Sequence, residues 1–193
     1  QAAVGLQHIY ESGLVHRDLK PSNLLVSRSG VKIADLGLAM FNQAESTQGL
    51  LNSRKKTDDR LTGEHTVLGT VDYMAPEQAE ESREVDIRAD LYSLGCTLFR
   101  LLVGRAPYAL PENSTPFKKM MAHASDPIPD IQRFRPDLPD GLVEVINRLL
   151  QKSRFDRYSE PRQLVDALTP FSGVVDFPTL ILSSDRPKRK VIT

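Results

Sequence analysis

Four residues near the start of the chain have the side-chain types that phosphoryl transfer requires. Asp18 can orient a hydroxyl and accept its proton, and Lys20 can place a compact positive charge against a phosphate. Asn23 and Asp35 supply a neutral and a charged oxygen, which are the ligands that Mg²⁺ prefers. Phosphoryl transfer depends mainly on positioning and charge neutralisation, so this combination predicts that reaction. An Arg–Asp pair alone would indicate only a charged loop.

The residues around these four follow the pattern of a known family. Residues His16–Asn23 read HRDLKPSN, which matches H-R-D-L-x-x-x-N, the catalytic-loop pattern of protein kinases. Further matches follow in family order, at Val31–Gly37 (VKIADLG), Gly69–Glu77 (GTVDYMAPE), Asp90–Gly95 (DLYSLG) and Arg157. The chain therefore resembles a eukaryotic-like Ser/Thr protein kinase of the bacterial type, and the motifs are highly specific as a set.

The resemblance implies a mostly α structure, the C-terminal lobe of the α+β kinase fold. Short apolar runs at 24–26 and 31–34, separated by a polar turn, predict a small β-hairpin that carries the catalytic and metal-binding loops. Apolar periodicity and helix-start signals predict helices at 2–12, 91–102, 116–124, 142–150 and 161–168. We expect the leucines of the second helix, Leu101 among them, and Met120–Met121 of the third to pack in the core.

The matches divide the chain into two parts. Residues 1–170 are expected to form a partial kinase domain, and residues 171–193 a flexible linker or tail. The family's Gly-rich loop, strand lysine and partner glutamate have no counterpart here, so the N-terminal β lobe is absent and is expected to precede Gln1. The chain alone is therefore expected to lack kinase activity. A polar stretch at 45–62 predicts an insertion in the activation segment.

The resemblance assigns roles to individual side chains. The implied roles are catalysis for Asp18, Lys20 and Thr70, ATP binding for Lys20, Asn23, Leu25 and Asp35, and Mg²⁺ binding for Asn23 and Asp35. Thr70 is expected to lie near Asp18 and shape the site for an aliphatic hydroxyl. Leu25 is expected to form the floor of the adenine pocket, to pack in the core, or both. Leu36 stands where the family usually has Phe, but the metal ligand before it is retained.

Further residues are implied as structural supports. Glu77 is expected to form a buried ion pair with Arg157, which would anchor the end of the activation segment. Asp90 is expected to brace the backbone of the catalytic loop, and His16 to have a structural role.

Regulation is expected to involve Arg17, which in the family can pair with a phosphate on the activation segment. Thr62 and Thr66 are the favoured phosphorylation sites, with Thr57 and Ser53 as weaker candidates. An ordinary loop hydroxyl remains the alternative for each of them. Dimerisation for activation-segment phosphorylation is an accompanying expectation.

Composition limits the classes of partner. Lys and Arg together number 25, as do Asp and Glu, so the formal net charge is zero and no nucleic-acid partner is expected. Cys96 is the only cysteine, which fits a reducing compartment and predicts a cytoplasmic location. No stretch of this chain predicts a membrane span, although the full-length protein could be anchored elsewhere. The basic cluster at 186–190 reads as a solvated linker, with a juxtamembrane segment as the alternative.

Three functions compete on this evidence. The first is an ATP- and Mg²⁺-dependent Ser/Thr kinase with a protein substrate. The second is a pseudokinase or scaffold lobe, against which the retention of Asp18, Lys20, Asn23 and Asp35 argues. The third is a small-molecule phosphotransferase, which shares a D-x-x-x-x-N loop but lacks the A-P-E segment. The sequence predicts neither a substrate motif nor an activating signal.

Overall fold

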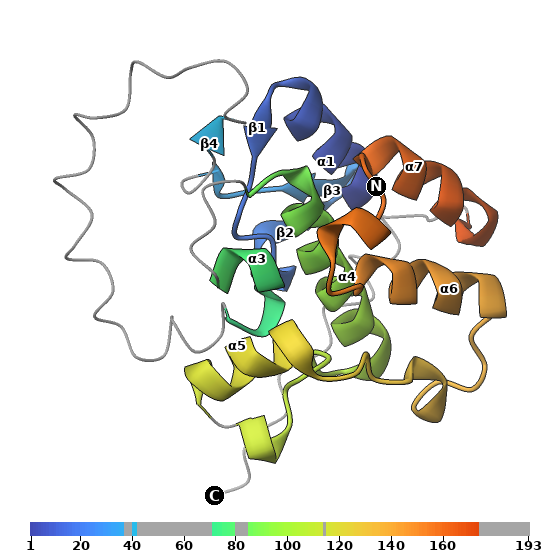
Figure 1. Cartoon of the computed structure of the whole chain (residues 1–193). Coiled ribbons are helices and arrows are strands. Elements are labelled where there is room, and N and C mark those ends of the chain that lie inside the picture. The colour runs from blue at the N-terminus through green and yellow to red at the C-terminus, as the bar shows by residue number, and fades with distance from the viewer. Residues whose placement is uncertain (37–39, 42–70, 80–84, 114, 174–193) are drawn as a thin grey trace, which may run out of the picture.

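The computed structural model describes residues 1–36, 40–41, 71–79, 85–113 and 115–173. These residues form a helical body with two small antiparallel sheets of two strands each (Figure 1). The mostly helical fold with a small hairpin that the sequence predicts is confirmed.

The elements follow one another in a simple order, and short 3₁₀ turns connect several of them. The helices are α1 (Ala2–Glu11), α3 (Pro76–Ala79), α4 (Ile87–Val103), α5 (Pro116–Ser125), α6 (Asp140–Leu149) and α7 (Pro161–Leu168). The strands are β1 (Leu14–Val15), β2 (Leu24–Ser27), β3 (Gly30–Ile33) and β4 (Met40–Phe41).

Helix α4 runs through the middle of the molecule (Figure 1). It begins at Asp86, whose side chain accepts a hydrogen bond from the backbone N–H of Arg88. It ends at Gly104, which has the left-handed φ of 89° that suits glycine at this position. Both ends are therefore specified by local sequence signals.

Two hydrophobic clusters flank this helix. One contains Tyr92 and Phe99 of α4 with residues of α6, and the other contains Leu91 with Leu6 of α1 and Leu164 of α7. Helices α4 and α6 approach so closely that a Cβ on Gly95 would lie 2.7 Å from Leu149 Cβ. Glycine is needed at this crossing because any larger residue would push the helices apart.

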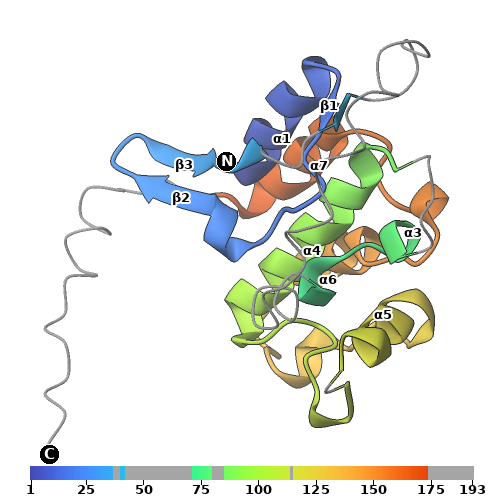
Figure 2. The same ribbon diagram turned by 90° about the vertical axis from the view of Figure 1, so that its left-hand side faces the viewer.

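The hairpin of β2 and β3 projects from one side of the helical body (Figure 2). Its strands pair antiparallel, with Leu24 opposite Ile33 and Ser27 opposite Gly30. Ile33 packs toward α1, where its Cδ1 lies 3.1 Å from the Cβ position of Gly5. The hairpin thereby holds the residues just before β2 and just after β3 at one end, against the helical body.

Two core assignments from the sequence are wrong. The side chain of Leu101 is 68% exposed, and that of Met121 is 49% exposed. The fully buried residues of α4 end at Phe99. In the last turn Leu102 and Val103 pack partly buried against one cluster, whereas Leu101 lies on the exposed side of the helix. On α5 the buried face is formed by Lys119, Ala122 and His123 instead.

Candidate active site

The catalytic loop lies between β1 and β2, and one buried leucine holds it in place. Leu19 is fully buried in the cluster formed with α1 and α7, whereas its neighbours Asp18 and Lys20 face the site. Lys20 Nζ donates to Asp18 Oδ2 at 2.7 Å, and Asn23 Nδ2 lies 3.4 Å from the same oxygen. The side chains of the three predicted residues therefore converge on one carboxylate.

The orientation of the Asn23 amide follows from its surroundings. Its Nδ2 donates to the backbone O of Asp18 at 2.8 Å, and a carbonyl oxygen can only accept, so the nitrogen must face this side. The amide oxygen Oδ1 therefore points elsewhere, where its only described contact is a long one of 3.4 Å to Ser22 Oγ. Asn23 thus retains an oxygen for a cation.

Asp35 is joined to this loop through one backbone contact. Ala34 N–H donates to the backbone O of Asn23 at 2.8 Å, which fixes the residue just before Asp35 against the residue just before β2. The Asp35 side chain is exposed. An amide oxygen and an exposed carboxylate on two joined loops fit Mg²⁺, which usually takes one or two protein ligands and completes its shell with phosphates and water.

Backbone strain is concentrated at the same place. Among the described residues, the non-glycine residues with positive φ are Arg17 at 66° and Asp35 at 63°. Such conformations are costly for a side chain with a Cβ, and they persist where the surroundings enforce them. Arg17 directly precedes Asp18, the predicted catalytic base, and Asp35 is itself a predicted metal ligand.

Asp90 enforces the conformation of the catalytic loop. Its carboxylate is fully buried and accepts from the backbone N–H groups of His16, at 2.7 Å, and Arg17, at 2.8 Å. Burial raises the pKa of Asp90 to about 6, and the two N–H donors oppose this by favouring the charged form. The bracing contact expected from the sequence is present.

His16 is buried and connects the catalytic loop with Ala34, the residue before the predicted metal ligand Asp35. The backbone N–H of Asp18 can only donate, so His16 Nδ1 accepts it, at 3.3 Å. Nε2 lies 3.0 Å from the backbone O of Ala34 and must therefore carry the proton. The neutral Nε2–H tautomer satisfies both contacts.

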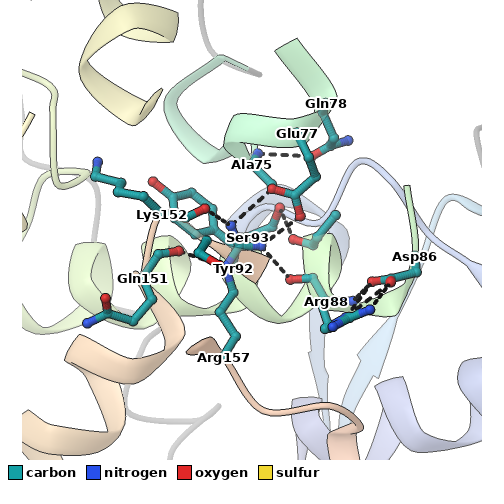
Figure 3. Close-up of polar contacts among 12 residues, drawn as sticks. Ala75, Glu77, Gln78, Asp86, Arg88, Tyr92, Ser93, Gln151, Lys152 and Arg157 are labelled. Carbon is teal, nitrogen blue, oxygen red and sulfur yellow. Dashed lines mark hydrogen bonds and ion pairs between the residues drawn. The ribbon is translucent and has the colours of Figure 1, made fainter. Parts of the chain in front are cut away.

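Glu77 and Arg157 form the expected buried ion pair (Figure 3). The two N···O distances are 2.7 and 3.0 Å. The remaining three N–H groups of the guanidinium donate to backbone carbonyls, so all five donors are satisfied. These carbonyls belong to Arg88, Gln151 and Lys152. This one side chain therefore fastens α3 and α4 to the segment after α6.

A small pocket opens beside Asp18. The residues that line it come from the catalytic loop, from the end of the activation segment and from α4: Arg17, Asp18, Leu19, Tyr73, Met74, Gln78 and Ser93. Ser93 Oγ fixes one wall by donating to the backbone O of Tyr73 at 2.7 Å. The pocket has a volume of about 10 Å³, which is room for about one water molecule beside the Asp18 carboxylate.

Other residues that the sequence predicts for the site are either not described by the structure or lie on its surface. Thr70, Thr62 and Thr66 lie outside the described residues. Leu25 is 54% exposed on the hairpin, so its predicted packing in the core is wrong and the role in ligand binding remains a prediction.

The sequence did not single out Gln78, which contacts the catalytic loop, or the buried cluster around His123. The hydrogen bonds involved connect residues far apart in the chain; Gln78 and Arg17, for example, are 61 positions apart. Only the position of Gln78 directly after the A-P-E motif could have drawn attention to it.

Comparisons with known proteins show the family of the chain. Residues 1–168 match the family model described as "Protein kinase domain". The chain is 36% identical to Serine/threonine-protein kinase AfsK of Streptomyces griseus, over 87% of this chain and 18% of that protein. It is 35% identical to Serine/threonine-protein kinase pkn2 of Myxococcus xanthus, over 87% of this chain and 19% of that protein.

A third relative is the DNA damage-responsive serine/threonine-protein kinase RqkA of Deinococcus radiodurans, which is 36% identical over 81% of this chain and 21% of that protein. The chain thus spans about a fifth of the length of these relatives. The chain belongs to the protein kinase family, within its bacterial, eukaryotic-like Ser/Thr group.

Proposed function

We propose that the whole protein transfers the γ-phosphate of ATP to a serine or threonine hydroxyl of a protein substrate. The observation that supports this most is the convergence of the Lys20 and Asn23 side chains on the Asp18 carboxylate. The relatives named above are Ser/Thr protein kinases, which agrees with this reaction.

The reaction requires one bond to form and one to break. The substrate hydroxyl oxygen bonds to the γ-phosphorus as the bond to the β–γ bridging oxygen breaks, and ADP leaves. Asp18 orients the hydroxyl and takes its proton, while Lys20 places positive charge on the transferring phosphate. The 2.7 Å contact between them keeps the ammonium next to the site of transfer.

We propose Mg²⁺ as the cofactor, held by Asn23 Oδ1 and the Asp35 carboxylate. When bound, Mg²⁺ neutralises charge on the phosphate oxygens and orients them. The described residues contain no cluster of three or more His, Cys, Asp or Glu that could hold a metal by itself. ATP phosphates and water would therefore supply the other ligands.

We also propose the assignment of residues 1–170 to the C-terminal lobe, with residues 171–193 as a linker or tail. The exposed Leu25 on the projecting hairpin supports this, because an apolar side chain at that position can cover one face of a purine. The other wall of the nucleotide site would come from an N-terminal lobe that precedes Gln1. The chain alone would then lack activity.

Regulation and location belong to the same proposal. Arg17 would pair with a phosphate on Thr62 or Thr66, placed there by a second copy in a dimer.

Among the described residues, no helix has the length and apolarity that crossing a bilayer requires. A cytoplasmic location remains a proposal that follows from the single cysteine and the reaction.

Phosphoamino acid analysis tests the function. The complete protein is incubated with ATP labelled at the γ-phosphate and a mixed protein substrate, with Mg²⁺ or with excess EDTA. We expect label on serine and threonine only, and none in EDTA. Absence of transfer under all conditions, with intact ATP binding, would support the pseudokinase alternative instead.

A further inference from the structure

The peptide group between Arg17 and Asp18 is held at both of its polar atoms by side chains. Its oxygen, the backbone O of Arg17, accepts from Gln78 Nε2 at 2.8 Å. Its N–H, that of Asp18, donates to His16 Nδ1 at 3.3 Å. The plane of the peptide that directly precedes the catalytic carboxylate is therefore fixed from two sides.

Gln78 uses both ends of its amide for this contact. Its Nε2 donates to Arg17 O. Its Oε1 accepts from the backbone N–H of Ala75 at 3.0 Å, across the start of α3 (Figure 3). The amide orientation is determined, since the first partner is an acceptor and the second a donor. The Glu77–Arg157 ion pair anchors the same helix, so Gln78 acts from a fixed base.

The left-handed conformation of Arg17 explains why such support is needed. A residue at φ 66° lies outside regular structure, so neither of its backbone polar groups finds a partner in a helix or sheet ladder. Asp90 satisfies the N–H of Arg17, and Gln78 satisfies its C=O. Without Gln78, the peptide plane that carries Asp18 could rotate.

We infer that Gln78 is a positioning residue for Asp18, which couples the A-P-E turn to the catalytic loop through the Arg17–Asp18 peptide. The inference rests on the proposed kinase function. His16 extends the connection to Ala34, the residue before the metal ligand Asp35. A displacement of α3 would thus move the Arg17–Asp18 peptide through Gln78. It would also move the residues next to Asp35 through His16.

The variant Gln78→Glu separates the two contacts. A glutamate still accepts from Ala75 N–H, but its ionised carboxylate cannot donate to Arg17 O and repels it. Near pH 8 we expect kcat of the complete protein to fall about tenfold, with KM for ATP changed less than about twofold. The matched control is Gln151→Glu, just after α6, which removes an amide donor to the backbone carbonyl of Asn147 within that helix.

The pH profile distinguishes positioning from a general loss of structure. A protonated glutamic acid can again donate to Arg17 O, and partial burial beside a carbonyl raises the pKa of such a group. The ratio of Gln78→Glu to wild-type kcat should therefore rise as pH falls from about 8 to about 5.5. A ratio that stays low over this range, or equals one throughout, overturns the inference.

Hydrogen exchange of this chain provides a readout that needs no activity. In Gln78→Glu we expect faster amide exchange in residues 14–23 and unchanged exchange in α6. Faster exchange in both segments, residues 14–23 and α6, would show that Gln78 only stabilises the fold and would overturn the inference. A wild-type protein that transfers no phosphate would contradict the proposed function, whereas an active Gln78→Glu equal to wild type would contradict only the role of Gln78.

Discussion

At the residue scale, the amide nitrogen and the amide oxygen of Asn23 have different roles. The hydrogen bonds of the residue determine which atom takes which role. Its Nδ2 is used by the backbone O of Asp18, so only Oδ1 is available to a metal ion. Its backbone O also holds the loop that leads to Asp35. The same residue therefore supports the catalytic loop and keeps the oxygen with which we propose that it binds Mg²⁺.

Two variants separate these roles. Asn23→Ala removes the oxygen and should raise the Mg²⁺ concentration for half-maximal activity by at least about tenfold. Asn23→Asp keeps an oxygen but replaces the donor with a charge next to Asp18 O, so it should retain Mg²⁺ dependence near wild type while kcat falls. The measurement is a Mg²⁺ titration of initial rates in the complete protein. An Asn23→Ala curve that overlays wild type would exclude Asn23 as a ligand.

The Glu77–Arg157 pair predicts a non-additive effect on stability. Glu77→Ala leaves the buried Arg157 guanidinium without its carboxylate and should lower the free energy of unfolding by about 3–5 kcal/mol. Replacing both residues by apolar ones of similar size, Glu77→Leu with Arg157→Met, should cost less than the two single changes summed. Urea titration measures each value.

An exposed pair provides the comparison for that experiment. Arg162→Ala on α7 breaks an ion pair with Asp166 in which both side chains are about two-thirds exposed, and should change stability by less than about 1 kcal/mol. Strict additivity of the Glu77 and Arg157 changes would show that the buried pair is not coupled.

At the element scale, the contact between α4 and α5 contains a buried ionisable cluster. His123 of α5 is fully buried, and its Nδ1 lies 2.8 Å from Tyr92 Oη of α4. Lys152 Nζ donates to Tyr108 Oη and to the backbone O of His123. Burial, with the positive charges of Lys152 and Lys119, lowers the pKa of His123 to about 3.

This pKa predicts acid sensitivity of the α4–α5 contact. An unfolded histidine titrates near pH ~6.5, so between about pH 6.5 and about pH 3 the unfolded chain binds one more proton than the folded one. The free energy of unfolding should fall with decreasing pH in this window, by up to about 1.4 kcal/mol per pH unit from this group.

His123→Gln tests that assignment, because the glutamine amide can hydrogen-bond Tyr92 Oη as donor or acceptor but does not ionise. The difference in unfolding free energy between wild type and variant should shrink or reverse as pH falls from about 7 to about 4. Denaturant titrations at a series of pH values measure it. Parallel pH profiles of the two proteins would show that His123 does not titrate in this range.

At the scale of the whole molecule, the features that sequence predicts are those with local causes. The helix start at Thr115–Pro116 and the hairpin were predictable because caps and turns involve residues adjacent in the chain. The catalytic loop was predictable because its residues lie within eight positions. The Glu77–Arg157 pair is 80 residues apart and was expected only through the family resemblance.

Other features depend on packing that no local pattern encodes. The bond from Gln78 to Arg17 requires α3 to lie against the catalytic loop, and the Tyr92–His123 contact requires α5 to lie beside Tyr92 of α4. Leu101 was predicted to be buried because it continues a leucine-rich helical face, yet its neighbours Leu102 and Val103 pack against a hydrophobic cluster and Leu101 does not. Burial at the end of a helix depends on what covers it, which the helix sequence does not contain.

The central claim is that Asp18 accepts the proton of the substrate hydroxyl during phosphoryl transfer. The most direct measurement is the rate of a single turnover by the complete protein with Mg²⁺ and labelled ATP, comparing wild type with Asp18→Asn. The matched control is Asp166→Asn, an exposed carboxylate on α7. We predict a loss of at least about 100-fold for Asp18→Asn and none for the control. Equal phosphate incorporation by Asp18→Asn and wild type would contradict the account.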